Sequence, residues 1–507
     1  MRKVLGTAVA RRVGLLVMAT AVLALAPAAA HAATLGFAPP VYVDKTLAGG
    51  EPSVAYANKS GLLVYTAHEG TTHLFSSNIP GAPAESGGWL ANYRNQVNIW
   101  TSANSGSSWQ VVNALAGFFT NPLINTGFSD PDLTQDESGN IYDTGIDLAN
   151  DALFSSQDGG KTWPTGTPQC HEGDRPWLAG GKANEAFLST DSDDDGHAVF
   201  HSTDAGASCS SNGIVDAGNT ADGGSFTGDG KPYYDHLRGN LVEPVIYHDT
   251  NGQVNGVGVG LLPDASHAFS SSSAHFDQVH IANTTMYSHW PAMTIDSAGN
   301  YYLVWDTDDR DTTSANGCPP TDSGSESFGG SSNAATPLAN SVEMAVSTDG
   351  GHTWSAPQTV AHTAGHRLLW PWVTAGAPGN VGVVWYQYDR VTDPDCGTGN
   401  VSVMAARITG ATGAAPEETT ADAAGRPIHS GAVCAGGTVC AVAVGVTGED
   451  RRLGDYFTVG TDSRGCVIVA TGDTKLTDPV TGNPSPISHP LFLRQNAGPG
   501  LTGSDCT

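Results

Sequence analysis

Short apolar runs alternate with turns rich in Asp, Gly and Asn along nearly the whole chain. Residues 342–346 read VEMAV and residues 301–305 read YYLVW, and both runs stand beside such turns. Aromatic and β-branched residues favour strands, whereas Asp and Gly favour the tight turns between strands. We find no long stretch with helical periodicity. The pattern predicts an all-β protein.

One turn sequence is repeated four times. Residues 347–354 read STDGGHTW and residues 156–163 read SQDGGKTW. Residues 102–109 carry Asn in place of Asp, and residues 202–209 carry Cys in place of Trp. An Asp side chain can bond the amides of its own turn, and Gly supplies the positive φ that such a turn needs. Four copies of one turn box indicate a fold built from similar units in series.

A second repeat marks where each unit begins, because a residue followed by Pro opens an apolar strand. These openings are Glu51-Pro52, Asp130-Pro131, Arg175-Pro176, Glu243-Pro244, Trp290-Pro291 and Trp370-Pro371, and Asp455-Tyr456 is a seventh without Pro. Each unit then consists of strand, turn, strand, loop, strand, turn box and strand, which is typical of a β-propeller. We expect a single propeller of four-stranded blades over residues 33–497, with seven blades, or six as the alternative. A strand over 41–46 is expected to close the last blade beside 490–495 and cover its edge, and residues 498–507 are expected to form a tail.

The first 32 residues have the features of a secretory signal peptide. Four basic residues precede the apolar run 13–25, and Ala-His-Ala follows at 30–32. Without this segment, 18 of the 22 basic residues remain against 50 acidic ones, a net charge of −32. Nucleic acid requires a basic face, so we exclude it as a partner. No later stretch is long and apolar enough to span a membrane. The sequence predicts a secreted, extracellular monomer.

Eight cysteines, all beyond the signal peptide, fit an oxidising compartment. Cys434 and Cys440 are close enough in sequence to bridge one loop. The other expected pairs are Cys318 with Cys396, Cys170 with Cys209 on either side of the third blade, and Cys466 with Cys506.

Blade geometry sorts the candidate functional residues onto one rim. The first-strand openings share a rim with the loops between second and third strands, and the turn boxes lie on the other. Acidic residues and arginines gather on the first rim, as at a binding or catalytic site, although turn caps and structural ion pairs are the alternative. The catalytic candidates are Tyr456, Glu243, Asp130 and Asp174. The substrate-binding candidates are Arg175, Arg238, Arg367 and Asp455.

Three carboxylates at alternate positions predict a metal loop. Asp191, Asp193 and Asp195 precede Gly196, and such spacing can wrap a hard cation such as calcium. A solvated acidic hairpin tip is the alternative. No cofactor is required, and a structural calcium is the one ion that this loop would bind.

The turn boxes are similar to the Asp-box, or BNR, repeat of sialidases and related propellers, and the resemblance extends over about 40–497. It implies a sialidase-like glycoside hydrolase acting on extracellular glycan. The resemblance would make Tyr456 the nucleophile, Glu243 the acceptor of its proton, and Asp130 or Asp174 the acid. The Arg-Ile-Pro motif of sialidases is missing, because residues 35–41 read LGFAPPV. The alternative is a non-catalytic propeller that binds glycan or protein on the same rim.

Overall fold

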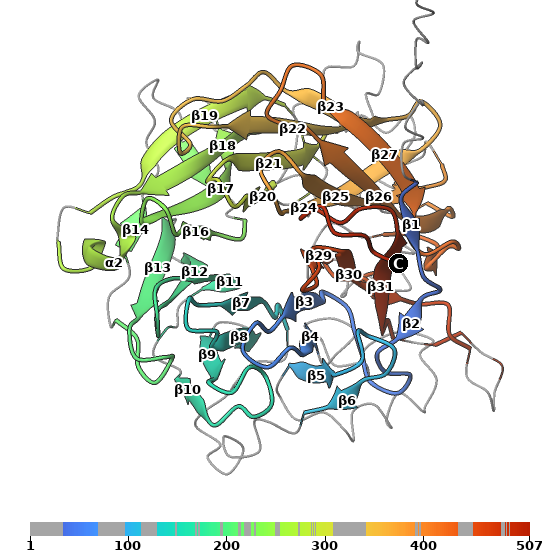
Figure 1. The fold of residues 1–507 in the computed structure, drawn as a ribbon, viewed down its shortest axis with the longest axis horizontal. Coiled ribbons are helices and arrows are strands. Elements are labelled where there is room, and N and C mark those ends of the chain that lie inside the picture. The colour runs from blue at the N-terminus through green and yellow to red at the C-terminus, as the bar shows by residue number, and fades with distance from the viewer. Residues whose placement is uncertain are drawn as a thin grey trace, which may run out of the picture. The chain divides into compact units, whose positions relative to one another are not determined.

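Seven antiparallel sheets follow one another around a common centre (Figure 1). The computed structural model describes residues 34–68, 97–112, 129–147, 150–167, 170, 173–192, 196–210, 214–216, 225–227, 230–248, 254–271, 274–284, 286, 288, 290–307, 341–390, 394, 397–433, 450–477, 482, 484, 485 and 487–507. The fold is a seven-bladed β-propeller, which confirms the expected class and decides between seven and six blades. In the described part of the chain, the one α-helix is the short α2 (Ala265–Ala268).

The blades follow the order of the chain. Blade 1 contains β3 (Ser53–Tyr56), β4 (Leu63–Ala67), β5 (Asn98–Ser102) and β6 (Gln110–Val111). Blade 2 contains β7 (Leu133–Gln135), β8 (Ile141–Asp147), β9 (Asn150–Ser156) and β10 (Thr165–Thr167). Blade 3 contains β11 (Asp174–Gly180), β12 (Ala186–Ser192), β13 (Gly196–Ser202) and β14 (Ile214–Asp216). Blade 4 contains β15 (Ser225–Thr227), β16 (Tyr233–Asp235), β17 (Asn240–His248), β18 (Val254–Leu262) and β19 (Asp277–Asn283).

The last three blades complete the ring. Blade 5 contains β20 (Ala292–Ile295), β21 (Tyr301–Asp306), β22 (Ser341–Ser347) and β23 (Gln358–His362). Blade 6 contains β24 (Arg367–Ala375), β25 (Val381–Tyr388), β26 (Asn400–Thr409), β27 (Glu417–Asp422) and β28 (His429–Ser430). Blade 7 contains β29 (Thr458–Thr461), β30 (Val467–Asp473) and β31 (His489–Ala497), together with β1 (Gly36–Phe37) and β2 (Val41–Tyr42) from the other end of the chain.

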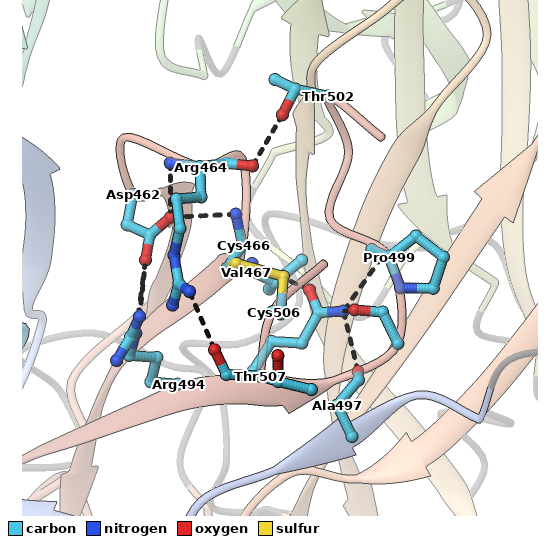
Figure 2. Close-up of a disulfide and its surroundings, with 12 residues drawn as sticks. Asp462, Arg464, Cys466, Val467, Arg494, Ala497, Pro499, Thr502, Cys506 and Thr507 are labelled. Carbon is cyan, nitrogen blue, oxygen red and sulfur yellow. Dashed lines mark hydrogen bonds and ion pairs between the residues drawn. A yellow bond between two sulfur atoms is a disulfide. The ribbon is translucent and has the colours of Figure 1, made fainter. Parts of the chain in front are cut away.

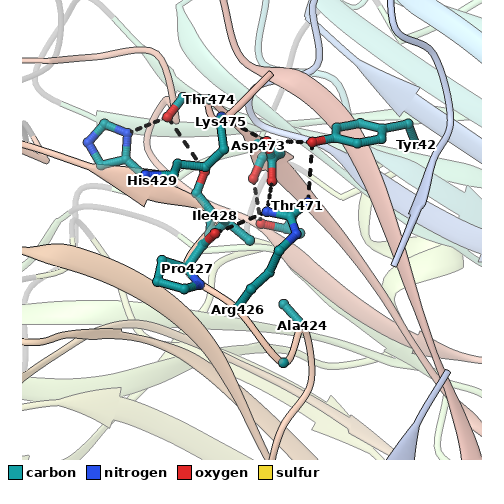
Figure 3. A network of polar contacts seen from close by, with 12 residues as sticks. Tyr42, Ala424, Arg426, Pro427, Ile428, His429, Thr471, Asp473, Thr474 and Lys475 are labelled. Atoms are coloured by element: carbon teal, nitrogen blue, oxygen red, sulfur yellow. Dashed lines mark hydrogen bonds and ion pairs between the residues drawn. The ribbon is translucent and has the colours of Figure 1, made fainter. Parts of the chain in front are cut away.

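The N-terminal strands close blade 7, as expected. Val41 pairs with Phe492 and Tyr42 with Leu491, and Figure 1 shows the blue β2 beside the red β31. A polar network holds this closure (Figure 3), in which the Tyr42 hydroxyl donates to Asp473 at 2.9 Å. Arg426 donates to the same buried carboxylate at 2.6 Å. Burial, together with the neighbouring Asp473, raises the pKa of Tyr42 to about 12.

The hydrophobic pattern changes with distance from the centre. All six residues of β21 are buried, because a middle strand has neighbouring blades on both of its faces, so a continuous apolar run forms it. The outer strand β27 reads EETTAD and is mostly exposed. Packing between blades therefore explains why middle strands are uninterrupted apolar runs and outer strands contain many polar residues.

The four repeated boxes fold into the same hydrogen-bonded turn. In the copy at 156–163, Gly160 N donates to Ser156 Oγ at 2.7 Å and Thr162 N donates to Asp158 at 2.9 Å. Equivalent pairs of bonds form in the other three copies. Hydrogen bonds from Thr353 lower the pKa of Asp349 to about 2. The boxes follow third strands, on the rim opposite the first-strand openings. Two of them also bond a neighbouring blade, because Ser60 Oγ donates to Gly159 O at 2.6 Å and Ser155 Oγ donates to Ala205 O.

Blade 4 departs from the expected plan. Glu243-Pro244 was predicted to open a first strand, and this is wrong, because both residues lie inside β17, the second strand. Pro244 has no N–H to donate to the ladder, and the inner strand opposite it is divided into β15 and β16. Gly230 N donates to Pro244 O at 2.8 Å in the gap. The Glu-Pro pair in the interior of β17 therefore has the same sequence pattern as the residues that open a first strand.

The C-terminal residues expected to form a tail are instead attached to the propeller (Figure 2). Leu501 N donates to Gly465 O at 2.7 Å, and Ala377 N donates to Leu501 O at 2.9 Å. The segment therefore connects turns of blades 7 and 6. Cys466 forms a disulfide with Cys506, and Arg464 donates to the terminal Thr507 at 2.9 Å.

Both disulfides in the described part of the chain were expected. Cys170 pairs with Cys209, and Cys466 pairs with Cys506. Such bridges form and persist in oxidising compartments. The other two expected pairs, the signal peptide over 1–32, and Asp193 and Asp195 lie outside the described residues. Within the described residues, no helix has the length and hydropathy of a membrane span.

Replacing Cys466 and Cys506 together with Ser is expected to lower the free energy of unfolding by about 3–4 kcal/mol. The bridge closes a loop with a sequence separation of 40, and the loss follows from the loop entropy of the unfolded chain. Guanidinium unfolding followed by tryptophan fluorescence measures it. The exposed Ser504→Ala is the control, and an unchanged midpoint in the double variant would contradict a stabilising bridge.

Candidate active site

The backbone at the blade openings adopts an uncommon conformation. Glu51, Asp130, Arg175 and Trp370 each precede Pro, and their φ angles are +47°, +51°, +58° and +50°. A left-handed conformation costs a non-glycine residue about 1–3 kcal/mol and persists only where the surroundings enforce it. Such strain tends to occur at functional sites, and here it recurs at four openings on the rim where the site was predicted.

Glu51, at the opening of blade 1, contacts residues from two other blade openings on this rim. Its side chain is 1% exposed and accepts hydrogen bonds from Ser129 Oγ at 3.2 Å and from the Asp455 amide at 3.0 Å. His68 Nδ1 lies 3.5 Å from the carboxylate. Gly454 makes this approach feasible, because its φ is +75° and a Cβ there would lie 2.2 Å from Glu51 Cγ. One carboxylate thereby connects the openings of blades 1, 2 and 7.

Asp130 shares a serine hydroxyl with Glu51. Ser129 Oγ lies 2.6 Å from Asp130 Oδ1 and 3.2 Å from Glu51 Oε2. A hydroxyl has one hydrogen to donate, so it can satisfy only one carboxylate at a time. The second contact becomes a hydrogen bond when one of the carboxyls is protonated and donates to the serine oxygen.

The charges around this pair favour a proton on Asp130. Burial, followed by the charges of Glu51 and Asp174, raises the pKa of Asp130 well above its usual value. Burial acts in the same direction on Glu51, but the contact with His68 outweighs it and lowers the pKa of Glu51 to about 2. Two neighbouring carboxyls whose pKa values are driven apart are a pattern of acid and base groups in catalytic sites.

Asp455 and Arg451 form a buried ion pair beside Glu51. Arg451 Nη2 lies 2.6 Å from Asp455 and 3.7 Å from Glu51, and its Nη1 also contacts Asp455. Burial opposes the positive charge, but Asp455 and Glu51 outweigh it and raise the pKa of Arg451. The guanidinium therefore compensates carboxylates from blades 1 and 7.

Aromatic rings fill the space next to the carboxyl groups of Glu51, Asp130 and Asp455. The Tyr456 ring lies 4.8 Å from that of Trp177 and 5.9 Å from that of Trp372. Its hydroxyl donates to Pro131 O at 2.7 Å. Burial and then the charges of nearby carboxylates, Glu51 first, raise the pKa of Tyr456 well above its usual value. Tyr456 thereby connects the opening of blade 7 to that of blade 2.

Asp174 and Arg175 bring blade 3 to the same rim. Asp174 is exposed and Arg175 half-buried. The guanidinium of Arg175 lies 5.1 Å from the centre of the Trp290 ring. An exposed carboxylate and an arginine next to an aromatic ring are groups that a bound polar ligand can contact.

Two predicted site residues lie elsewhere. Glu243 is inside β17, and its carboxylate is 2.7 Å from His197 Nε2, whereas the Tyr456 hydroxyl donates to a backbone carbonyl. The predicted pairing of Glu243 with Tyr456 is therefore not present. Arg238 lies in the turn between β16 and β17, bonded to Asp235 at 2.8 Å and to Gly299 O at 3.0 Å. That turn is on the box rim, so the predicted placement of Arg238 is wrong.

The remaining predicted residues are Arg367 and the three aspartates of the metal loop. Arg367 is the first residue of β24 and is 5% exposed on the predicted rim. Asp191 pairs through its backbone with Asp174 and His197. Among the described residues, no group of three His, Cys, Asp or Glu side chains is arranged to hold a metal ion. The calcium loop stays a prediction.

Sequence reasoning did not assign a role to Glu51, Ser129, His68 or Arg451. Glu51-Pro52 and Asp130-Pro131 are equivalent openings, and this equivalence was a usable signal for Glu51. His68, at the end of a second strand, and Arg451, among the arginines of the rim loops, also fall on this rim by sequence. Ser129 gave no such signal, because its role depends on contacts between blades.

Comparisons with known proteins show similarity of fold alone. No family model matches the chain, and none of the curated proteins matches it. A polysaccharide lyase of family PL25, an ulvan lyase, is 10% identical over 85% of this chain and 93% of its own, with a TM-score of 0.44. An α-L-arabinofuranosidase from Fusarium graminearum is 11% identical over 91% and 97%, with a TM-score of 0.39. A sialidase from Streptococcus pneumoniae is 10% identical over 90% and 70%, with a TM-score of 0.40. Values this low transfer no residue role to this chain.

Proposed function

We propose that the protein is a secreted glycoside hydrolase acting on extracellular glycans, with its site at the rim formed by Glu51, Asp130 and Asp174. The observation that carries the proposal is the carboxyl pair with opposed pKa shifts, Asp130 raised and Glu51 lowered, around one serine hydroxyl. A protonated carboxyl beside ionised ones suits cleavage of an acetal, which needs a proton donor and a carboxylate partner. The resemblance of the turn boxes to those of sialidases supports the same class.

In the proposed reaction Asp130 is the general acid. It transfers its proton to the glycosidic oxygen as the bond from that oxygen to the anomeric carbon breaks. Asp174, the exposed carboxylate whose charge acts on Asp130, accepts a proton from the water that adds to the anomeric carbon. Arg175 binds an anionic or strongly polar group of the sugar. Glu51 and Tyr456 position Asp130, through Ser129 and Pro131 respectively.

The pH dependence of turnover tests this assignment. Because the acid must be protonated, activity is expected to fall as pH rises through the raised pKa of Asp130. Release of sugar from sialylated, uronic and neutral glycans is measured for the wild-type protein between pH 4 and 10. Absence of release from every glycan class would overturn the hydrolase proposal, and activity restricted to high pH would overturn the role of Asp130.

A second candidate is a non-catalytic propeller that binds glycan on the same rim. The exposed fractions favour it, since Glu51 is 1% and Asp130 5% exposed, which leaves little of either carboxyl for a substrate. Glycan-array binding of the wild-type protein, combined with the absence of release, would support this candidate.

A further inference from the structure

A separate cavity of about 330 Å³ opens at the opposite rim, around the ends of the inner strands of blades 2 to 5. Its lining includes Gln135 from blade 2, Gly180 from blade 3, Tyr233 and Leu237 from blade 4, and Ile295 from blade 5. This volume is near the lower end of the ~300–1,000 Å³ range of small-molecule pockets. The cavity is therefore large enough for one ring-sized ligand.

Lys231 takes part in this lining and is held from several sides. The ammonium contacts the buried Asp132, and it donates to Leu133 O at 3.0 Å and to Leu178 O at 2.9 Å. An ammonium has three hydrogens, and these three contacts use all of them. Lys231 is thus unsuited to binding an anionic ligand.

The other charged groups of the lining are also satisfied. Asp235 accepts from Arg238 at 2.8 Å and from Tyr301 at 2.7 Å. Asp296 accepts from Tyr302 at 2.7 Å, and from Asn300 and Gly379. His236 and Glu137 pair at 3.0 Å. A charged ligand would find no uncompensated opposite charge among these groups, and desolvating it would be costly.

The remaining lining has both apolar and polar character. Leu237 is 66% exposed. It is one of the two large hydrophobic side chains that are exposed in the described part of the chain. Pro232, Tyr233 and Ile295 add further apolar surface. Thr134 Oγ1 and Gln135 Oε1 each accept a backbone hydrogen bond at 2.8 Å, so these two side chains offer a hydroxyl and an amide as donors. Apolar surface with a few polar groups suits a neutral ring that has a hydrophobic face and hydroxyls at its edge.

We propose that this cavity is a second, non-catalytic binding site for a neutral sugar residue. A glycan bound there would be held on the rim opposite the proposed active site. Because the two sites lie on opposite rims, the proposal stands whether or not the first site turns substrate over. On a polymer, the second site would raise the effective concentration of glycan near the protein.

Binding of defined sugars by full-length protein tests the proposal. The probes are cellobiose and lactose as neutral sugars, with glucuronic acid and glucosamine as charged ones, measured by isothermal titration and saturation-transfer NMR. Leu237→Asp is expected to weaken neutral-sugar binding at least tenfold, and Tyr233→Phe more mildly. Leu237 is exposed, so its replacement leaves the core unchanged. Val111→Asp, at the other exposed hydrophobic residue and 46% exposed, is the matched control and should bind as the wild type does.

The outcomes separate the two sites. Neutral-sugar binding that is lost in Leu237→Asp but kept in Asp130→Asn and in Val111→Asp supports the proposal. Failure of both neutral probes to bind overturns it, as does binding that Leu237→Asp leaves intact. Tighter binding of a charged probe that depends on Leu237 overturns the neutral class. Release of sugar from short substrates should be unchanged in Leu237→Asp, so a failed hydrolase proposal is recognised by the release assay alone.

Discussion

Asp130→Asn is expected to lower the rate of glycan cleavage about 10²–10⁴-fold, the usual contribution of general acid catalysis. Asparagine has nearly the same shape as a protonated aspartic acid and can donate to Ser129 as that acid would, but it has no proton to transfer to a leaving group. The loss should therefore appear in kcat, with glycan binding retained. Single-turnover release from the best substrate of the wild-type protein measures it.

The same variant should be at least as stable as the wild type at neutral pH. A carboxyl whose pKa is raised on folding destabilises the fold progressively as pH rises from its unfolded pKa, near 3.8, toward its folded pKa. Asparagine removes this dependence, so the stability difference in favour of the variant should grow with pH over that window. Gain of stability with loss of activity is characteristic of functional residues.

The exposed Asp277→Asn is the matched control, since Asp277 is 60% exposed and lies far along the chain on β19. It should change neither rate nor stability measurably. A cleavage rate within tenfold of wild type in Asp130→Asn would exclude Asp130 as the acid. A stability loss in Asp130→Asn would show that the carboxyl is ionised and favourably paired in the folded protein.

The fold was predictable because its signals are local and repeated. Each turn box depends on a Ser, an Asp or Asn, and a Gly within one turn, so a short sequence encodes its hydrogen bonds. The openings with Pro established the phase of most blades, and the pairing of Val41 with Phe492 followed from the need to cover an edge strand. Regularity of the repeat allowed seven openings to be counted, and the structure decided between seven and six blades.

The prediction failed where the repeat is irregular. Pro244 in a strand interior shifted the assignment of blade 4 by one strand, and a shift of one antiparallel strand exchanges the two rims. Arg238 was consequently placed at the wrong rim, and Glu243 was assigned to a site that it does not reach. A proline preceded by an acidic residue carries the same sequence signal in both settings, and only the divided inner strand distinguishes them.

The candidate site could be predicted only in part. Asp130, Asp174, Arg175, Asp455 and Tyr456 follow from the openings, and the structure brings them to one rim. The protonation of Asp130 could not be predicted, because it depends on burial and on Glu51, which lies 79 residues before Asp130 in the chain. The Lys231–Asp132 pair could not be predicted either, because its partners lie on different blades, 4 and 2.

Lys231→Met is expected to lower the free energy of unfolding by about 3–5 kcal/mol, the usual effect of leaving one partner of a buried ion pair uncompensated. Asp132 is fully buried, and burial already raises its pKa despite the neighbouring ammonium. Leu133 O and Leu178 O would lose their contacts with the ammonium as well. Urea unfolding measures the change, and the exposed Lys182→Met is the control, expected within about 0.5 kcal/mol of wild type.

Adding Asp132→Asn to Lys231→Met should restore part of the lost stability, because the uncompensated carboxylate is then removed. Lys231 and Asp132 connect blades 2, 3 and 4 close to the centre, since Leu178 N also donates to Asp132 at 2.9 Å. If the double variant were as unstable as the sum of the single ones, the two groups would not be energetically coupled. Each group would then contribute through its own backbone contacts, Asp132 with Leu178 N and Lys231 with Leu133 O and Leu178 O.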